Sequence, residues 1–367
     1  MKITSFLKCP LVTLALLVLL SLPTNAQTLE AKIDSLLFAK YESIAPGAAF
    51  LIAKNGNVIY RKAFGQANLE LNIPMKPENI FEIGSMTKQF TAIAILMLVE
   101  QGEIELTDEI TKFIPDYPTD NKKITVHHLL THTSGIKSYT RMKALNDIAT
   151  KDLTPMELID FFKDEPMDFN PGEKYRYNNS GYAILGYIIE SISKQSYASF
   201  IEEHIFKKLD MTSSLFASHS KVIKNRVSGY HKKEDYVNTR HISFSLPYAA
   251  GSLMSNVDDM LKWQEGLNDN RLVSKSTIDK AFTNYELNNG DSINYGYGWH
   301  IKELNGTPSR EHGGSIFGFK SMGVYLPLED IYVIGLNNCD CNSPTKITRE
   351  IAGLVNEEFA KKENNKN

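Results

Sequence analysis

A serine and a lysine three positions apart are the residues with the clearest chemical potential in this sequence. Ser85 and Lys88 stand in the run Gly-Ser-Met-Thr-Lys-Gln-Phe, and apolar residues between Ser85 and Gln101 surround most of a helix. We therefore expect a helix buried on nearly every side, with both side chains on one face of its first turn. Burial lowers the pKa of a lysine, and a neutral lysine can take the proton of a serine hydroxyl and make it a nucleophile.

The start of a helix also favours negative charge. At that position the backbone N–H of Ser85 can stabilise a developing oxyanion, because the helix macrodipole favours an anion there. The Ser-x-x-Lys pattern alone has a plainer explanation, since a helix N-cap followed by a solvated lysine produces the same residues. Further motifs must decide between the two.

The second motif is Tyr177-Asn178-Asn179, which follows a turn at Pro171-Gly172. In an extended segment Tyr177 and Asn179 face the same side. A phenol that can carry a proton then lies beside an amide that can hold a substrate carbonyl. The alternative is a core tyrosine next to a helix cap.

The third motif is Glu311-His312-Gly313-Gly314-Ser315. Its glycines stand between strand-like stretches and permit close approach of the backbone to a ligand. The alternative is an ordinary tight turn that carries a surface histidine.

Together the three motifs resemble the signature of the serine β-lactamase and penicillin-binding protein superfamily: Ser-x-x-Lys, then Tyr-x-Asn, then Lys or His followed by glycine. About ninety residues separate the first two motifs, and a longer stretch leads to the third, as in class C enzymes and their relatives. Other stretches look like this family too, so that the resemblance covers nearly the whole mature chain; they are Leu129–Gly135, Ala250–Ser255 and Tyr295–Trp299.

The resemblance implies a role for each matching residue. Ser85 would be the acylated nucleophile and Lys88 its proton acceptor. Tyr177 would pass a proton to the leaving group, and Asn179 would orient the substrate and Lys88.

The resemblance also implies roles in the third motif. The backbone N–H of Ser315, just after Gly314, would be the second oxyanion donor, and His312 would place a carboxylate or tune Tyr177. Dedicated class C β-lactamases carry Lys-Thr-Gly here, whereas histidine is similar to D-specific peptidases and DD-carboxypeptidases. Because histidine is only partly charged near neutral pH, we expect carboxylate binding at His312 to weaken as the pH rises.

The expected activity is hydrolysis of amide or ester bonds through an acyl-enzyme, acting on D-amino-acid-containing peptides or small esters. A class C-like β-lactamase and a slowly turning over penicillin-binding sensor are the alternatives. No cofactor is expected. An α/β-hydrolase is disfavoured because no Gly-x-Ser-x-Gly occurs in the chain.

A zinc site is the rival hypothesis for the histidine-rich segment. His128 and His132 are four residues apart, with His127 beside them, which is a spacing typical of metal ligands. No glutamate completes a His-Glu-x-x-His pattern, and the family-like stretch explains the same residues. We therefore expect no metal.

The fold expected is α/β of the β-lactamase/transpeptidase type: an antiparallel sheet flanked by helices, joined to an α-rich lobe, with the site between them. Asn55-Gly56 predicts a hairpin, and the middle of the chain predicts mainly helix and loop. The expected terminal helices are Leu29–Tyr41 and Thr345–Ala360. The expected strands are Ala48–Ala53, Val58–Phe64, Tyr297–Ile301, Ser321–Pro327 and Ile331–Leu336.

The first 26 residues are typical of an export signal, with lysines before an apolar run and small residues at its end. We expect residues 1–26 to be cleaved, 27–361 to form one hydrolase domain of two lobes, and 362–367 to be a polar tail. The mature protein is then periplasmic or secreted, without an integral membrane segment.

The charge distribution indicates a small-molecule or peptide substrate and no nucleic-acid partner. Losing the signal changes the formal charge from −3 to −5, and no basic stripe is present. Only Cys339 and Cys341 remain after cleavage, at the limit of disulfide reach, so the sequence leaves their oxidation open.

Overall fold

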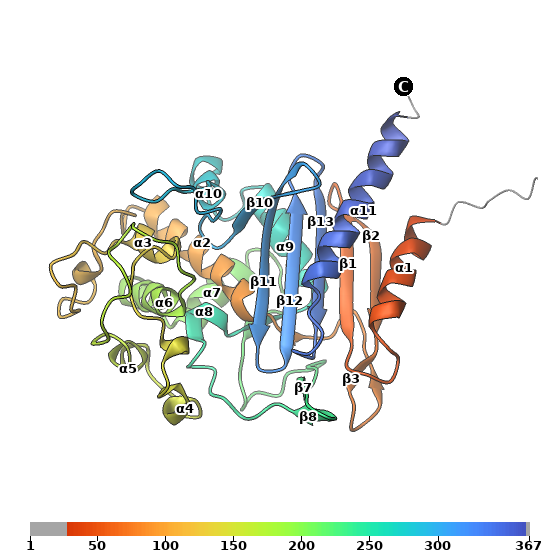
Figure 1. Cartoon of the computed structure of the whole chain (residues 1–367), viewed down its shortest axis with the longest axis horizontal. Coiled ribbons are helices and arrows are strands. Elements are labelled where there is room, and N and C mark those ends of the chain that lie inside the picture. The colour runs from red at the N-terminus through yellow and green to blue at the C-terminus, as the bar shows by residue number, and fades with distance from the viewer. Residues whose placement is uncertain (1–27, 365–367) are drawn as a thin grey trace, which may run out of the picture.

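The computed structural model describes residues 28–364, so the expected signal at 1–26 lies outside the described residues. Its centre is an antiparallel sheet of six strands in the order β10-β11-β12-β13-β1-β2 (Figure 1). The first strands along the chain pair with the last, so both ends of the chain build one sheet, as predicted. The strands are β1 Ala48–Lys54, β2 Asn57–Phe64, β10 His300–Leu304, β11 Thr307–Ile316, β12 Phe319–Leu326 and β13 Ile331–Asn337.

The first hairpin forms where the sequence predicts it. Asn55 and Gly56 both adopt positive φ angles, 50° and 70°, as the tightest hairpin turns require. β1 is buried along almost its whole length because helices cover both faces of the sheet. The predicted β-rich start of the chain is therefore confirmed.

One face of the sheet is covered by the two terminal helices, α1 (Leu29–Lys40) and α11 (Thr345–Asn364) (Figure 1). Their apolar residues pack on the strands in one core cluster, which includes Ile33, Phe50 and Ile351. α11 ends four residues beyond the predicted end at Ala360.

The other face packs against an α-rich lobe, and α2 (Thr87–Glu100) runs through its middle (Figure 1). Every residue of α2 from Thr87 to Leu98 is buried, which confirms the prediction of a helix buried on nearly every side. The remaining helices are α3 Val126–Leu130, α4 Leu145–Ile148, α5 Pro155–Asp160, α6 Asn179–Ser193, α7 Tyr197–Ile201, α8 Tyr248–Gly251, α9 Val257–Asn268 and α10 Lys275–Ala281.

Short strands outside the main sheet hold the connections in place. β5 pairs with β9, and β9 pairs with β6, which fixes the segment that leads into α2. The short strands are β3 Gln66–Asn68, β4 Ile73–Pro74, β5 Phe81–Glu82, β6 Leu215–Phe216, β7 Tyr230–Lys232, β8 Tyr236–Asn238 and β9 Leu253–Ser255.

The third motif differs from its prediction, because its glycines lie inside the ten-residue strand β11 and not between strands. A methyl group at Gly314 would overlap the carbonyl oxygen of Ile83, so glycine is required there for close approach and not for a turn. The predicted strand Tyr297–Ile301 also starts later, at His300, because Gly298 adopts φ 87° and interrupts the extended backbone.

Two further features concern membrane spans and the two cysteines at 339 and 341. Across residues 28–364, every helix is too short or too polar to cross a membrane. Cys339 and Cys341 form a disulfide, and their Cα atoms are 5.1 Å apart.

Candidate active site

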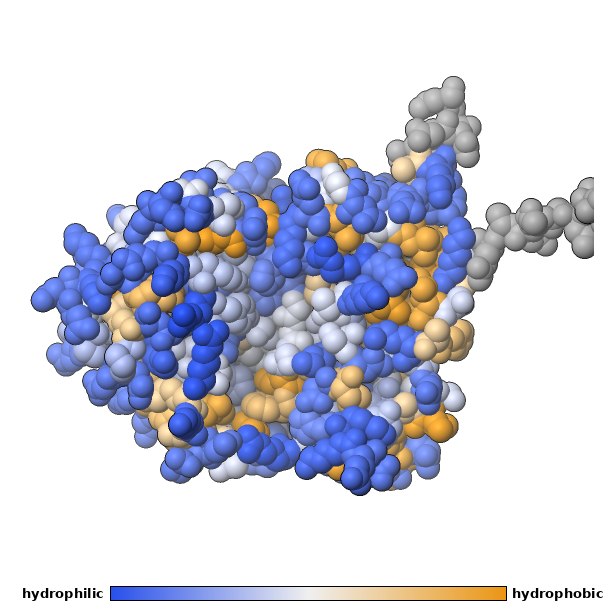
Figure 2. All heavy atoms as spheres, in the orientation of Figure 1, coloured by the Kyte–Doolittle hydropathy of each residue, from blue (hydrophilic) through white to orange (hydrophobic). Residues whose placement is uncertain are grey.

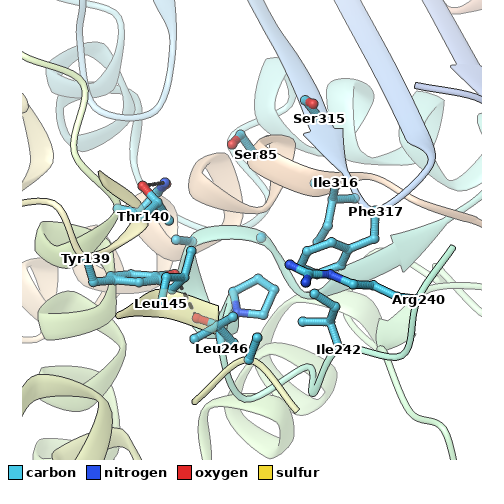
Figure 3. Close-up of a pocket in the computed structure, with 16 residues that line it drawn as sticks. Ser85, Tyr139, Thr140, Leu145, Arg240, Ile242, Leu246, Ser315, Ile316 and Phe317 are labelled. Carbon is cyan, nitrogen blue, oxygen red and sulfur yellow. Dashed lines mark hydrogen bonds between the residues drawn. The ribbon is translucent and has the colours of Figure 1, made fainter. Parts of the chain in front are cut away.

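A cavity of about 240 Å³ lies between the α-rich lobe and the sheet, beside Ser85. Ser85 belongs to the 3-10 turn η1 (Gly84–Met86), which continues directly into α2. Figure 3 shows Ser85 above this cavity, with the end of β11 on one side and Tyr139 and Thr140 on the other. The two lobes therefore meet at the residue that the sequence predicts as nucleophile.

The turn around Ser85 depends on a glycine. Gly84 has φ 53°, a conformation that disfavours other residues, and a Cβ there would lie 2.9 Å from the backbone nitrogen of Ser315. This close approach brings the Ser315 N–H next to the turn that carries Ser85. The two predicted oxyanion donors thus come from neighbouring segments.

Lys88 is wholly buried, with 0% of its surface exposed. Its Nζ lies 2.7 Å from Asn179 Oδ1, 2.8 Å from the carbonyl oxygen of Ala250 and 3.3 Å from Ser85 Oγ. Burial lowers the pKa of Lys88 well below its ordinary value. A neutral lysine amine has two hydrogens, which the two nearer oxygens can accept, so its lone pair is left directed at Ser85 Oγ.

The second motif forms the N-terminus of α6. Asn178 is the N-cap, and its side chain accepts a hydrogen bond from the Gly181 N–H. Asn179 is the first helical residue; besides accepting from Lys88, it donates through Nδ2 to Thr140 Oγ1 at 3.1 Å. Asn178 is therefore the helix cap that one sequence interpretation expects, while Asn179 faces Lys88.

Tyr177 presents its hydroxyl to the site without a protein partner. Its Oη is buried and has no hydrogen bond to any described residue. Burial raises the pKa of Tyr177 above its ordinary value, and the nearby Ser85 hydroxyl opposes that rise. Lys88 Nζ lies 4.8 Å from the centre of the Tyr177 ring, so the two groups are neighbours.

His312 differs from its predicted environment. Its side chain is only 2% exposed and does not line the cavity beside Ser85. Burial, followed by the nearby His300 and Lys88, lowers the pKa of His312 well below its ordinary value. This direction runs against the expectation of a partly charged histidine near neutral pH, because burial disfavours the charged imidazole.

Hydrogen bonds fix the tautomers of two buried histidines. His132 Nδ1 accepts from the Asn178 N–H, so the hydrogen of neutral His132 is on Nε2, which points at the Tyr295 hydroxyl 3.3 Å away. Tyr295 can then donate to His312 Nε2 at 3.1 Å, and His312 Nδ1–H donates to the Gly313 carbonyl. These hydrogen bonds therefore run in one direction, from His132 through Tyr295 to His312.

Sequence reasoning missed His132 and Tyr295 as members of the site. Both lie in the family-like stretches Leu129–Gly135 and Tyr295–Trp299, which were the available signal. The His132 ring also contacts the Tyr177 ring, with 4.3 Å between the ring centres. His132 therefore connects the second motif to the third.

The Ser315 side chain bonds to a lysine. Its Oγ accepts from Lys320 Nζ at 2.7 Å, and Figure 3 shows Ser315 at the upper edge of the view, near Ser85. β10 pairs with β11 only as far as Glu311, so the segment from His312 to Ile316 has no strand partner on that side among the described residues. The backbone of this segment is therefore available to a substrate beside Ser85.

The histidine-rich segment does not gather into a metal site. His127 Nδ1 pairs with the Tyr297 hydroxyl at 2.8 Å, and His128 Nδ1 pairs with Thr125. Within the part of the chain that the structure describes, no group of three or more His, Cys, Asp or Glu side chains is arranged to hold a metal ion.

Comparison with known proteins gives a consistent result. The beta-lactamase family model matches residues 31–354. Penicillin-binding protein 4* of Bacillus subtilis is 30% identical over 297 residues, which is 74% of this chain and 63% of that protein. The chain thus spans less than two thirds of that relative's length.

Solved structures agree on the fold. The octameric penicillin-binding protein homologue from Pyrococcus abyssi is 34% identical, with a TM-score of 0.77 over 89% of this chain and 76% of its own. The D-amino acid amidase from Ochrobactrum anthropi SV3 has a TM-score of 0.78 at 22% identity, over 91% of this chain and 99% of its own. The match of the family model over residues 31–354 shows that the chain belongs to the beta-lactamase family.

Proposed function

We propose that this protein cleaves amide or ester bonds through an acyl-enzyme on Ser85, with Lys88 as proton acceptor and Tyr177 as proton donor to the leaving group. The position of the Lys88 amine carries the proposal. It is wholly buried and lies between the Ser85 hydroxyl and two fixed oxygen acceptors. A solvated lysine behind a helix cap would have no such environment.

Acylation begins when neutral Lys88 takes the Ser85 proton and Ser85 Oγ attacks the substrate carbonyl. The developing oxyanion is stabilised by the backbone N–H groups of Ser85 and Ser315, which the approach of β11 to η1 brings together. Asn179 holds Lys88 and is a half-buried residue that lines the cavity, where its amide can also meet the substrate.

Collapse of the intermediate requires a proton on the leaving group. The unpartnered Tyr177 hydroxyl supplies it, and Lys88 then returns the proton it took from Ser85 to Tyr177. A water molecule next attacks the ester, with the same groups acting in reverse, and frees Ser85. Every proton is returned, so the cycle needs no cofactor.

We propose D-amino-acid amides or peptides and small esters as the substrate class. Penicillin-binding relatives and the fold of the D-amino acid amidase support bonds of this kind. The buried, neutral His312 favours substrates without a free carboxylate beside the leaving group. β-Lactams carry such a carboxylate, and so do peptides that lose their C-terminal residue. Carboxypeptidase substrates, a class C-like β-lactamase and a penicillin sensor therefore fit the site less well than amides and esters with a neutral leaving group.

The test compares hydrolysis of D-phenylalanine amide, L-phenylalanine amide, p-nitrophenyl acetate and benzylpenicillin by the wild type and Ser85→Ala. Ser276→Ala is the control, because Ser276 is an exposed serine on α10. We expect turnover of an amide or ester by the wild type and the control, and none by Ser85→Ala. Equal turnover by Ser85→Ala would contradict the proposal, and preference for benzylpenicillin would favour the β-lactamase alternative.

We further propose that the protein is exported after removal of residues 1–26, on the strength of the sequence pattern alone. The mass of the protein recovered from the periplasm or medium should then correspond to a chain that starts at Gln27. A full-length mass there would contradict cleavage.

A further inference from the structure

We propose that the cavity beside Ser85 binds an acyl group that is apolar along its length and negatively charged at its far end, with Arg240 as the residue that recognises the charge. This inference rests on the proposed function and specifies its substrate. It concerns the acyl side of the scissile bond, which no motif of the sequence addresses.

The cavity walls are mainly apolar. Beyond the reacting groups, its lining consists largely of hydrocarbon and aromatic side chains, among them Leu145, Ile242, Leu246, Ile316 and Phe317. Figure 2 shows hydrophobic residues gathered below the centre of the viewed face, between the lobe and the lower ends of β11 and β12. Such walls stabilise a methylene chain or ring, because the apolar surface of the ligand is removed from water.

Arg240 is the one charged residue that lines this cavity. Its guanidinium makes a hydrogen bond to Asn146 Oδ1 at 2.9 Å, and no ion pair joins it to a carboxylate among residues 28–362, whose side chains the structure describes. The nearby carboxylate of Glu82 pairs instead with Arg226. Since a guanidinium has five N–H donors, Arg240 keeps donors free for a ligand carboxylate or other anion.

Ser85 and Arg240 approach the cavity from different sides. Figure 3 shows Ser85 at its upper end, whereas the Arg240 side chain reaches in from the right beside Phe317, above Ile242 and Leu246. An acyl group attached to Ser85 would lie between the apolar walls of a cavity that also holds the guanidinium. A carbon chain with a terminal carboxylate fits this arrangement.

The leaving-group side offers a contrast. The resemblance assigns carboxylate placement to His312, but that imidazole is buried and engaged by Tyr295 and the Gly313 carbonyl. Charge recognition at this site then falls to Arg240, on the acyl side. The site accordingly selects an anionic acyl group joined to a neutral leaving group.

The experiment measures kcat/KM for mono-p-nitrophenyl esters of adipic, pimelic and suberic acid and for the neutral p-nitrophenyl esters of equal chain length. The ratio of the two rates at each length reports recognition of the terminal charge. It is compared in the wild type, Arg240→Gln and Arg240→Lys. The control is Arg271→Gln, because Arg271 is an exposed arginine that bonds the Lys208 carbonyl and does not line the cavity.

We expect the wild type and Arg271→Gln to prefer the anionic ester at one chain length. Arg240→Gln should lower that ratio about 5-fold, the size of a partly exposed ion pair, and Arg240→Lys should retain part of it. A ratio at or below one in the wild type, or a ratio unchanged in Arg240→Gln, would overturn the inference.

Failure of the proposed function is distinguished by a binding measurement that needs no catalysis. If Ser85 cleaves none of these esters, the N-propyl monoamide of adipic acid is titrated calorimetrically into Ser85→Ala with and without Arg240→Gln. About 5-fold weaker binding to the double variant would support recognition by Arg240 even then. Equal binding would overturn it.

Discussion

The protonation state of Lys88 decides the chemistry at the scale of single residues. Its three oxygen neighbours are ordered so that the two nearest accept hydrogens and the farthest, Ser85 Oγ, meets the lone pair of a neutral amine. Burial supplies the lowered pKa that makes this form available. The same burial makes the position intolerant of any group that stays charged.

A first prediction concerns Lys88 and pH. Neutral lysine is the active form, so activity should be full above its lowered pKa and fall as the pH drops through it, well below the ordinary 10.5. Lys88→Ala should lower kcat at least about 10²-fold, the usual weight of a general base. Pre-steady-state acylation rates measured as a function of pH check both the loss of activity at low pH and the effect of Lys88→Ala. If the activity of Lys88→Ala fell at low pH as that of the wild type does, the titrating group would be another residue.

A second prediction concerns Tyr295, which acts through His312 as a positioning residue. Tyr295→Phe removes the donor to His312 Nε2 while keeping the ring, so only the bond from Nδ1–H to the Gly313 carbonyl still holds the imidazole. We expect kcat to fall about 10-fold, and the imidazole of His312 to titrate at a higher pH by NMR, because its Nε2 becomes free to bind a proton. Tyr285→Phe, which removes a hydroxyl outside this chain of hydrogen bonds, is the control.

An unchanged histidine titration in Tyr295→Phe would contradict the assignment. The NMR measurement matters because loss of a purely structural tyrosine would lower activity without shifting the titration of His312.

At the scale of elements, the approach of β11 to η1 builds the oxyanion side of the site. β11 must pass the carbonyl of Ile83 without a side chain, and Gly84 must leave room for the Ser315 nitrogen. The pairing of β5 with β9 holds η1 in front of the strand.

A third prediction follows for Gly314→Ala. The added methyl group meets the backbone of Ile83, which cannot move aside as a flexible side chain can, so β11 must shift from η1. We expect a loss of about 1–3 kcal/mol in the free energy of unfolding and a loss of activity larger than that of Gly313→Ala, which meets its nearest atom at 3.1 Å. Equal effects of the two substitutions in urea unfolding and kcat would be inconsistent with this account.

The elements that the sequence predicts correctly are those whose signals are local in the sequence. The Asn55-Gly56 turn and the apolar surround of α2 are local, and both predictions are confirmed. The position of the glycines inside β11 was missed, because their reason is a close approach to Ile83, which only the tertiary structure reveals. The neutral state of His312 was missed likewise, since its burial and its partner Tyr295 come from other segments.

At the scale of the whole molecule, the sheet built from both chain ends joins a helical lobe that is contiguous in sequence (Figure 1). The site lies at the junction, so its residues come from three distant regions. This arrangement explains why the motifs and their order could be predicted from the sequence, whereas the cavity and Arg240 could not. Cavity walls come from loops whose placement no local pattern encodes.

A fourth prediction concerns the pH dependence of stability through Glu82, which precedes η1. Burial raises the pKa of Glu82 to about 7, and Arg226 opposes the rise. Between the unfolded value of 4.5 and about 7 the folded chain holds a proton that the unfolded chain has lost, so stability falls as the pH rises through this window.

Replacement by a neutral isostere isolates this effect. In the wild type, Glu82 should lower the free energy of unfolding by about 2–3 kcal/mol between pH 5 and 8, at about 1.4 kcal/mol per pKa unit. Glu82→Gln should remove this decrease. Urea unfolding of both proteins at the two pH values measures it. Identical pH dependence in the wild type and the variant would refute the assignment to Glu82.

The most direct test of the central claim is covalent labelling of the wild type with a fluorophosphonate, which reacts with activated serines, followed by peptide mass spectrometry. The account predicts one modified peptide that carries the label on Ser85, much slower labelling of Lys88→Ala, and no label on Ser85→Ala. A label on another serine, or labelling of Lys88→Ala at the wild-type rate, would contradict activation of Ser85 by the buried lysine.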